Sequence, residues 1–208
     1  IVEILNEDGT MARRPDLEKF AAEHGIKLGT IADLIEYRNQ HETTVEEVAR
    51  CQLPTEYGEF ELVTFRDTID SQLHFALCKG ELNGAAAPLV RVHLHDYFSD
   101  VLLTDRHAPR SWPIHEAMQR VANEGGVLVI LGNEGGQNEL LARVQQFAAI
   151  DRGEQQLQHK RQEASRRVGV GSQILKSLGV TKMRLLSGQK RYHALSGFGL
   201  EVVEYISE

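Results

Sequence analysis

Five consecutive apolar residues, Val-Leu-Val-Ile-Leu at positions 127–131, constrain the fold of this chain more than any other feature. A strand with one face in water alternates apolar and polar residues, whereas an unbroken apolar run of this length is typical of a strand buried on both faces. Apolar residues at helical spacing precede the run over residues 113–122, and a glycine-rich turn and a second amphipathic stretch follow it. This order of helix, buried strand and helix predicts an α/β layer.

Other strand-like runs surround this layer. Before residue 120, apolar or alternating runs separated by polar turns predict an antiparallel part, at residues 60–65, 73–79 and 89–93. After it, we expect a charged surface excursion at 151–167, a short helix at 174–178, a helical turn at 191–195, and strands at 180–186 and 200–206. The predicted fold class is mixed α/β (α+β), with an antiparallel β part and an α/β layer.

The first forty residues predict a separate small unit. Residues 1–5 read as a short strand, Pro15 begins a helix that stops at Gly25, and residues 30–37 read as a second, capped helix. Because residues 39–47 are polar and lack an apolar face, we place a boundary there, giving domains 1–41 and 42–208. The chain starts in a strand-like run without an initiator Met, so we expect it to be a piece of a longer protein.

Composition narrows the class of protein. A net charge of −7 over 208 residues argues against a nucleic-acid binder, which would carry a basic patch. No run reaches the length of a membrane span, and no signal segment opens the chain. The two cysteines, Cys51 and Cys78, are too few for a disulfide scaffold, so we expect free thiols and a cytoplasmic protein.

Residues 2–13 read V-E-I-L-N-E-D-G-T-M-A-R. This string resembles the E-(I/L)-x-N-x-D-G-T-M-A-R pattern near the C-terminal end of 3,4-dihydroxy-2-butanone 4-phosphate synthase. The resemblance implies that residues 1–41 are the C-terminal remnant of such a domain. It also implies that Glu3 serves catalysis on ribulose 5-phosphate only within an intact synthase, whose magnesium ligands lie upstream of this sequence.

Residues 48–208 resemble GTP cyclohydrolase II, the enzyme that opens the guanine ring at the start of riboflavin synthesis. Matching pieces include L-P-T-E-Y-G-E-F at 53–60 and V-R-V-H at 90–93. A synthase followed directly by a cyclohydrolase II domain is the order found in the bifunctional riboflavin-biosynthesis protein. The resemblance therefore implies an upstream synthase domain in the same chain, and a homodimer.

The residues that would perform the cyclohydrolase reaction are replaced. The family binds zinc through three cysteines, in R-V-H-S-E-C and a later C-x-C, and the zinc activates the attacking water. The corresponding positions here are Asp96, His107 and Pro109, and the position of the catalytic base is Ala164. We therefore expect no metal and no cofactor, and a domain that supports or regulates the fused synthase without catalysis of its own.

Two alternatives stay open. Arg91, Glu134, Arg166 and Ser187 match nucleotide-binding positions of the family, so a nucleotide, flavin or phosphate ligand would make the domain a sensor. The turn at 132–136 would bind phosphate through its backbone N–H groups or would only connect a strand to a helix. The other alternative is a residual GTP cyclohydrolase whose metal site is rebuilt from the cluster His93, His95, Asp96 and His107.

Overall fold

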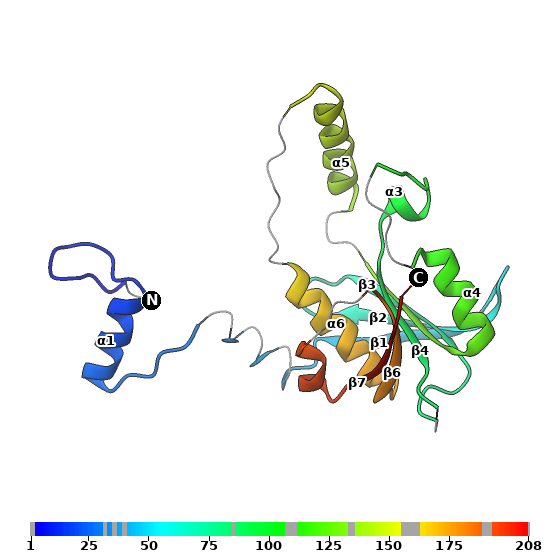
Figure 1. The fold of residues 1–208 in the computed structure, drawn as a ribbon, viewed down its shortest axis with the longest axis horizontal. Coiled ribbons are helices and arrows are strands. Elements are labelled where there is room, and N and C mark those ends of the chain that lie inside the picture. Colours follow the sequence, from blue (N-terminus) through cyan, green and yellow to red (C-terminus); the bar gives the residue numbers. More distant parts are fainter. Residues whose placement is uncertain are drawn as a thin grey trace. The chain divides into compact units, whose positions relative to one another are not determined.

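A computed structural model describes residues 3–30, 33, 34, 37, 38, 41–84, 86–106, 112–132, 136–154, 163–188 and 193–207. Contacts between residues divide the chain into two compact units, Ile1–His41 and Glu42–Glu208. Figure 1 shows the elements of both units. Within the described ranges, no helix is both long enough and apolar enough to cross a bilayer.

The N-terminal unit contains helix α1 (Arg14–His24), which ends at Gly25 in the left-handed conformation with φ 62°. Of the strand predicted at residues 1–5, the described part retains an isolated antiparallel bridge between Leu5 and Met11. The helix predicted at residues 30–37 is described only at 33–34 and 37–38, which are helical; its other positions from 31 on lie outside the described residues. Ala12 is the one hydrophobic residue buried among those described in this unit.

The C-terminal unit is built on a sheet of seven strands in the described residues, in the order β1-β2-β3-β5-β4-β6-β7. The neighbours from β1 to β5 pair antiparallel, and those from β5 to β7 pair parallel. The predicted antiparallel part is confirmed for the runs at 60–65 and 73–79, whereas the run at 89–93, expected in the same part, is β4 and pairs parallel with β5 and β6. All seven strands form one continuous sheet together with the predicted α/β layer. The strands are β1 (Val45–Thr55), β2 (Gly58–Asp67), β3 (Leu73–Lys79), β4 (Leu89–Leu94), β5 (Gly126–Leu131), β6 (Lys182–Leu186) and β7 (Glu201–Ile206).

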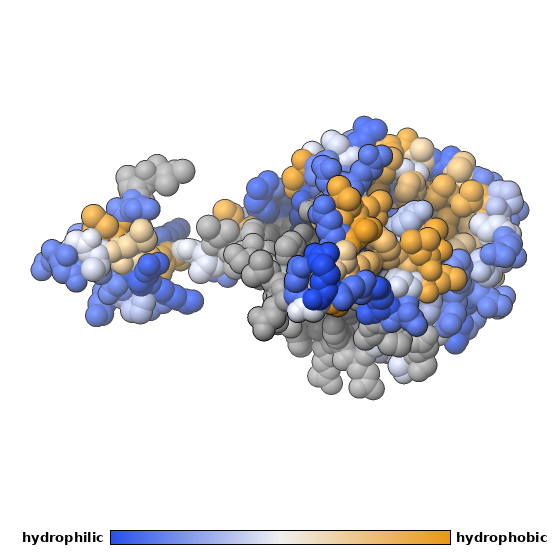
Figure 2. Space-filling model, turned by 90° about the horizontal axis from the view of Figure 1, so that it is seen from above, coloured by the Kyte–Doolittle hydropathy of each residue, from blue (hydrophilic) through white to orange (hydrophobic). Residues whose placement is uncertain are grey.

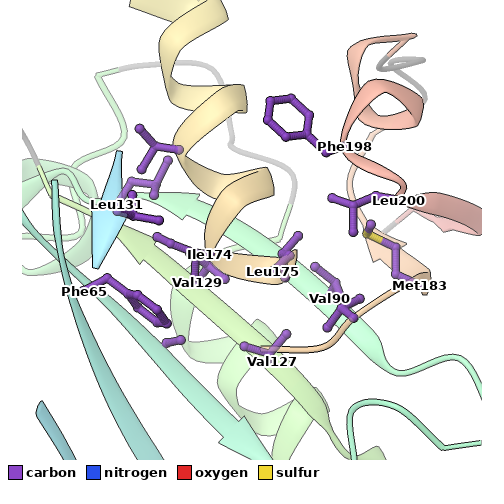
Figure 3. Close-up of a cluster of buried hydrophobic side chains, with 14 of the residues drawn as sticks. Phe65, Val90, Val127, Val129, Leu131, Ile174, Leu175, Met183, Phe198 and Leu200 are labelled. Atoms are coloured by element: carbon purple, nitrogen blue, oxygen red, sulfur yellow. The ribbon is translucent and has the colours of Figure 1, made fainter. Parts of the chain in front are cut away.

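Helices cover both faces of this sheet. On one face, α6 (Glu163–Ser177) packs through Ile174 and Leu175 onto Val127, Val129 and other strand residues, as Figure 3 shows. On the other face, α4 (Ile114–Glu124) packs through buried Ala117 and Val121. The strand predicted from the apolar run at 127–131 is therefore buried between two layers. The remaining elements are α3 (Tyr97–Asp100), α5 (Gly136–Asp151) and the 3₁₀ helix η1 (His193–Phe198).

Three elements differ from the sequence prediction, one of them the short helix α3, which was not predicted. β1 was not predicted, because its side chains are mostly polar and exposed; backbone pairing with β2 holds it at the edge of the sheet, with a bulge between Glu47 and Ala49. The predicted charged excursion at 151–167 and short helix at 174–178 were wrong in their bounds, since α6 already begins at Glu163. Gly171 weakens the helical pattern of the sequence. A glycine suits this position because a Cβ there would lie only 3.1 Å from the Val92 side chain.

At the start of β5, the backbone of the neighbouring strand β4 comes so close that the position requires glycine. Gly126 has φ 136°, and a Cβ there would lie 2.1 Å from the carbonyl oxygen of Leu89 in the neighbouring strand. We predict that Gly126→Ala lowers the free energy of unfolding by about 3 kcal/mol or more, because the β4–β5 pairing must shift. Urea denaturation measures this change.

The matched control is Gly153→Ala. Gly153 also has positive φ, 76°, but no atom lies within 4 Å of its Cβ position. Left-handed strain alone costs about 1 kcal/mol. Equal losses of stability in the two variants would contradict the role assigned to backbone packing at Gly126.

Candidate active site

The segment that follows β4 contains the first of the replaced zinc positions. Asp96 is buried and caps the N-terminus of α3, where its Oδ1 accepts a hydrogen bond of 3.0 Å from the backbone N–H of Phe98. Its own backbone N–H donates to Oδ2 of Asp100 over 2.8 Å. Asp96 therefore has a structural role in closing this short helical turn.

Two of the three histidines of the predicted metal cluster, His93 and His95, also contact Asp100. The side chain of His93 is 1% exposed, and its Nε2 lies 2.9 Å from both carboxylate oxygens of Asp100. Nδ1 of His95 lies 3.5 Å from Oδ2 of the same carboxylate. The single carboxylate of Asp100 therefore engages both Nε2 of His93 and Nδ1 of His95.

A guanidinium occupies the other side of Asp96. Nη2 of Arg143, from α5, lies 3.3 Å from Oδ2 of Asp96. Two further contacts join the same segments: the rings of Phe98 and Phe147 meet edge to face at 5.2 Å, and Arg106 pairs with Asp151 at 2.9 Å. We call these three contacts, Asp96–Arg143, Phe98–Phe147 and Arg106–Asp151, the α3–α5 clamp. α3 and α5 lie side by side in Figure 1.

These residues do not fit the zinc site that the family resemblance implies. A structural or catalytic zinc needs about three converging protein ligands. In the part of the chain that the structure describes, no group of three or more His, Cys, Asp or Glu residues could hold a metal ion. Asp96, the only one of the three replaced cysteine positions that lies in the described residues, pairs its carboxylate with the guanidinium of Arg143. His107 and Pro109 lie outside the described residues.

The clamp makes a prediction about stability. Removing Arg143 leaves the buried Asp96 carboxylate without that cation, and because Arg143 is itself partly exposed, the loss is moderated by solvent. We predict that Arg143→Met lowers the free energy of unfolding by about 1–2 kcal/mol in urea, whether EDTA is present or absent.

Arg152→Met is the control, because Arg152 is exposed and, among the described residues, pairs with Glu154 in the turn after α5. That substitution should change stability by no more than about 0.5 kcal/mol. A double variant that adds Asp96→Asn to Arg143→Met should lose less stability than the two single variants together. Strict additivity would show that the ion pair does not couple the two residues.

The turn that follows β5 begins with a glycine required by packing. A Cβ at Gly132 would lie 2.5 Å from the carbonyl oxygen of Leu73. The backbone N–H of Gly132 donates to Nδ1 of buried His74 over 3.0 Å. Gly132 therefore allows the backbone to pack closely where β5 ends beside the start of β3. Glu134, predicted as a nucleotide contact in this turn, lies outside the described residues.

His74 predicts a pH dependence of stability. Burial lowers the pKa of His74 from its ordinary value of 6.5, and the acceptor role of Nδ1 toward Gly132 requires that this nitrogen carry no proton. In the unfolded chain the ring binds a proton below about pH 6.5, so the stability present above that pH is lost as the pH falls. We predict that His74→Gln, whose amide oxygen can accept the same hydrogen bond, flattens the pH dependence between pH 7 and 5. An unchanged slope in urea titrations would contradict this assignment.

A cavity of about 180 Å³ lies at the carboxyl ends of three neighbouring parallel strands, β5, β4 and β6, beside α6. Ligands of open α/β sheets bind at this edge. Figure 3 shows Leu131, Leu175 and Met183 of its wall. The described residues that line the cavity are Arg91, Val92, Leu94, Leu131, Arg167, Val168, Gly171, Ser172, Leu175, Met183, Leu185, Leu186, Ser187 and Leu195.

Two of the residues predicted to contact a nucleotide line this cavity. A third is paired with carboxylates elsewhere. Arg91 and Ser187 both line it, and Nη1 of Arg91 donates to the carbonyl oxygen of Leu186 over 2.9 Å. Arg166 instead pairs with Asp67 at 3.0 Å and with Asp70 at 2.6 Å.

Its neighbour Arg167 lines the cavity and was not predicted. The spacing of positions 167, 171 and 175, one turn apart on a helix, would have indicated it.

Two further positions were singled out from the sequence, Glu3 and Ala164. Glu3 is exposed in the N-terminal unit. Ala164, at the expected position of the catalytic base, lies in α6, and its side chain is outside the described residues. The sequence did not indicate Asp100 or Arg143. Asp100 accepts a hydrogen bond from the backbone N–H of Asp96, and Arg143 pairs with the Asp96 carboxylate.

A family model described as GTP cyclohydrolase II matches residues 46–207. The chain belongs to the GTP cyclohydrolase II family. A second family model, described as 3,4-dihydroxy-2-butanone 4-phosphate synthase, matches residues 1–37. The cyclohydrolase II match covers the whole sheet and both helical layers, and the synthase match lies within the N-terminal unit.

Individual relatives match nearly the whole chain. A Photobacterium phosphoreum protein named 3,4-dihydroxy-2-butanone 4-phosphate synthase is 51% identical over 207 residues, which are 99% of this chain and 55% of that protein. The riboflavin biosynthesis protein RibBA of Aquifex aeolicus is 40% identical over 213 residues, covering 99% of this chain and 52% of the relative. The chain thus spans about half the length of the relatives it matches.

A solved structure is also similar. It is described as RibBX, a two domain 3,4-dihydroxy-2-butanone 4-phosphate synthase from A. baumannii. The TM-score is 0.67 at 39% sequence identity, over 99% of this chain and 53% of the other.

Proposed function

We propose that residues 42–208 form a non-catalytic GTP cyclohydrolase II-like domain that supports or regulates a 3,4-dihydroxy-2-butanone 4-phosphate synthase in the same polypeptide, in riboflavin biosynthesis. One observation carries this proposal: Asp96, at a cysteine position of the family, caps α3 and pairs with Arg143. A side chain held in this way stabilises the domain and is not available as one of several converging zinc ligands.

The acid–base residues support the same proposal. General-base assistance typically contributes 10²–10⁴-fold to rate, and the alanine at position 164 has no group that accepts a proton. The guanidinium of Arg166 forms ion pairs with Asp67, at the end of β2, and with Asp70 in the turn that follows. Replacement of the zinc ligands and of the base, together with the engagement of Arg166 in ion pairs, would have to be compensated for GTP hydrolysis to persist.

The N-terminal unit supports the link to a synthase. Leu5, Met11, Ile26 and Leu28 are all exposed there, and apolar side chains are visible on its surface in Figure 2. Such residues are ordinarily covered in a complete domain. We propose that residues 1–41 complete a synthase domain in a longer, cytoplasmic, homodimeric protein, and that Glu3 acts within that domain.

Formate release from GTP tests the absence of catalysis. The purified chain is incubated with GTP, magnesium and added zinc, beside an active cyclohydrolase II and a boiled sample. We expect no release above the boiled sample, because water is not activated by a bound metal. Release above it would overturn the proposal and would favour the residual enzyme with a metal site rebuilt around His93, His95, Asp96 and His107.

A second candidate function is a sensor that binds a nucleotide or flavin and passes occupancy to the synthase. The cavity favours it, because Arg91 of β4 and Ser187, which directly follows β6, line the same space. Its test is saturable binding of GTP or a flavin without turnover, together with a ligand-dependent change in synthase rate of the longer protein.

A further inference from the structure

The cavity beside α6 has a wall that is unusual for a nucleotide site. Nine of the fourteen described lining residues carry apolar side chains, and the only charged ones are Arg91 and Arg167. None of these fourteen residues is acidic. The hydroxyl of Ser172 donates to the carbonyl oxygen of Val168 over 2.7 Å, within α6. The described wall therefore combines a broad apolar surface with two positive charges.

The size of the cavity limits what it can hold. Its volume of about 180 Å³ is below the ~300–1,000 Å³ typical of pockets for drug-sized ligands. A cavity of about 150 Å³ lined by aliphatic side chains holds a benzene molecule. The space beside α6 therefore suits one ring or a compact pair of fused rings.

The two arginines reach this space from different elements. Arg91 belongs to β4, and the hydrogen bond of 2.9 Å to the Leu186 carbonyl oxygen holds its guanidinium beside the end of β6. Arg167 lies in the first turns of α6. An anionic group on the ligand would be attracted by both guanidinium groups, while its ring lies among the apolar side chains.

We propose that this cavity binds a small anion with an apolar ring body, and that it prefers such a molecule to GTP. A guanine base has several polar edge groups, which would lose hydrogen bonds with water against Leu94, Leu131 and Leu175. A triphosphate carries more negative charge than two guanidinium groups balance. The proposal deepens the sensor function given above and rests on it only in assuming that the cavity is a binding site.

Fluorescence titration with 1-naphthyl phosphate tests the proposal, with 1-naphthol as the uncharged analogue and GTP as competitor. The full chain is used, and the far-ultraviolet circular dichroism of each variant is compared with that of the parent. We expect saturable binding of 1-naphthyl phosphate, at least tenfold weaker binding of 1-naphthol, and no displacement by an equal concentration of GTP.

Variants locate the site. Arg167→Gln should weaken binding of 1-naphthyl phosphate about tenfold or more, because a charge-assisted interaction is lost, whereas Arg167→Lys should keep most of the affinity. Lys176→Gln, on the exposed end of the same helix and outside the lining, is the charge-matched control and should bind as the parent does. Val168→Phe should fill the half-buried wall and abolish binding of both naphthyl compounds.

Three results would overturn the proposal. Equal affinity for 1-naphthol would show that the arginines do not select an anion. Displacement of 1-naphthyl phosphate by GTP at equal concentration would restore the nucleotide as the preferred ligand. Absence of saturable binding, or equal losses in Arg167→Gln and Lys176→Gln, would show that the cavity is not the site. All these readouts are of binding, so they are separate from the formate and synthase assays that test the proposed function.

Discussion

The fold depends on β5, because this strand joins two kinds of sheet and two layers of helix. It pairs antiparallel with β3 on one side and parallel with β4 on the other, and it is buried beneath α4 and α6. Gly126 lets the strand begin in contact with the Leu89 backbone, and Gly132 lets it end against Leu73. The edge where ligands reach open α/β sheets, and with it the cavity, is set by where β5 stops.

The sequence predicted the fold well where hydrophobicity and periodicity agree. The apolar run at 127–131 and the runs before residue 120 identified the central strands, and the runs at 60–65 and 73–79 are antiparallel as predicted. The run at 89–93 was wrongly assigned to the antiparallel part, because apolar patterning does not reveal the direction of a strand. β1 was missed because an edge strand is held by backbone pairing and needs few apolar residues. The start of α6 was missed because Gly169 and Gly171 weaken a helical pattern; the close packing of Gly171 on Val92 explains the second of these glycines.

The candidate site was harder to predict, for a physical reason. Sequence comparison located Arg91, Asp96 and Ser187, but the partners that decide their chemistry are remote in sequence. Arg143 lies 47 positions from Asp96, and the carbonyl oxygen bonded to Arg91 belongs to a residue 95 positions away. A zinc–thiolate centre joins distant segments through the metal, whereas here an ion pair, an aromatic contact and a surface pair join α3 to α5.

The exposed position of β1 has a consequence for how molecules of this protein meet one another. A long edge strand offers a row of backbone donors and acceptors to any strand of another molecule, and such pairing can propagate without end. In β1 the bulge at Glu47–Ala49 interrupts that row, and the side chains of Glu47 and Arg50, paired at 2.9 Å, add charge along the strand. The polar character that hid this strand from prediction thus also protects the protein from growing into fibrous assemblies.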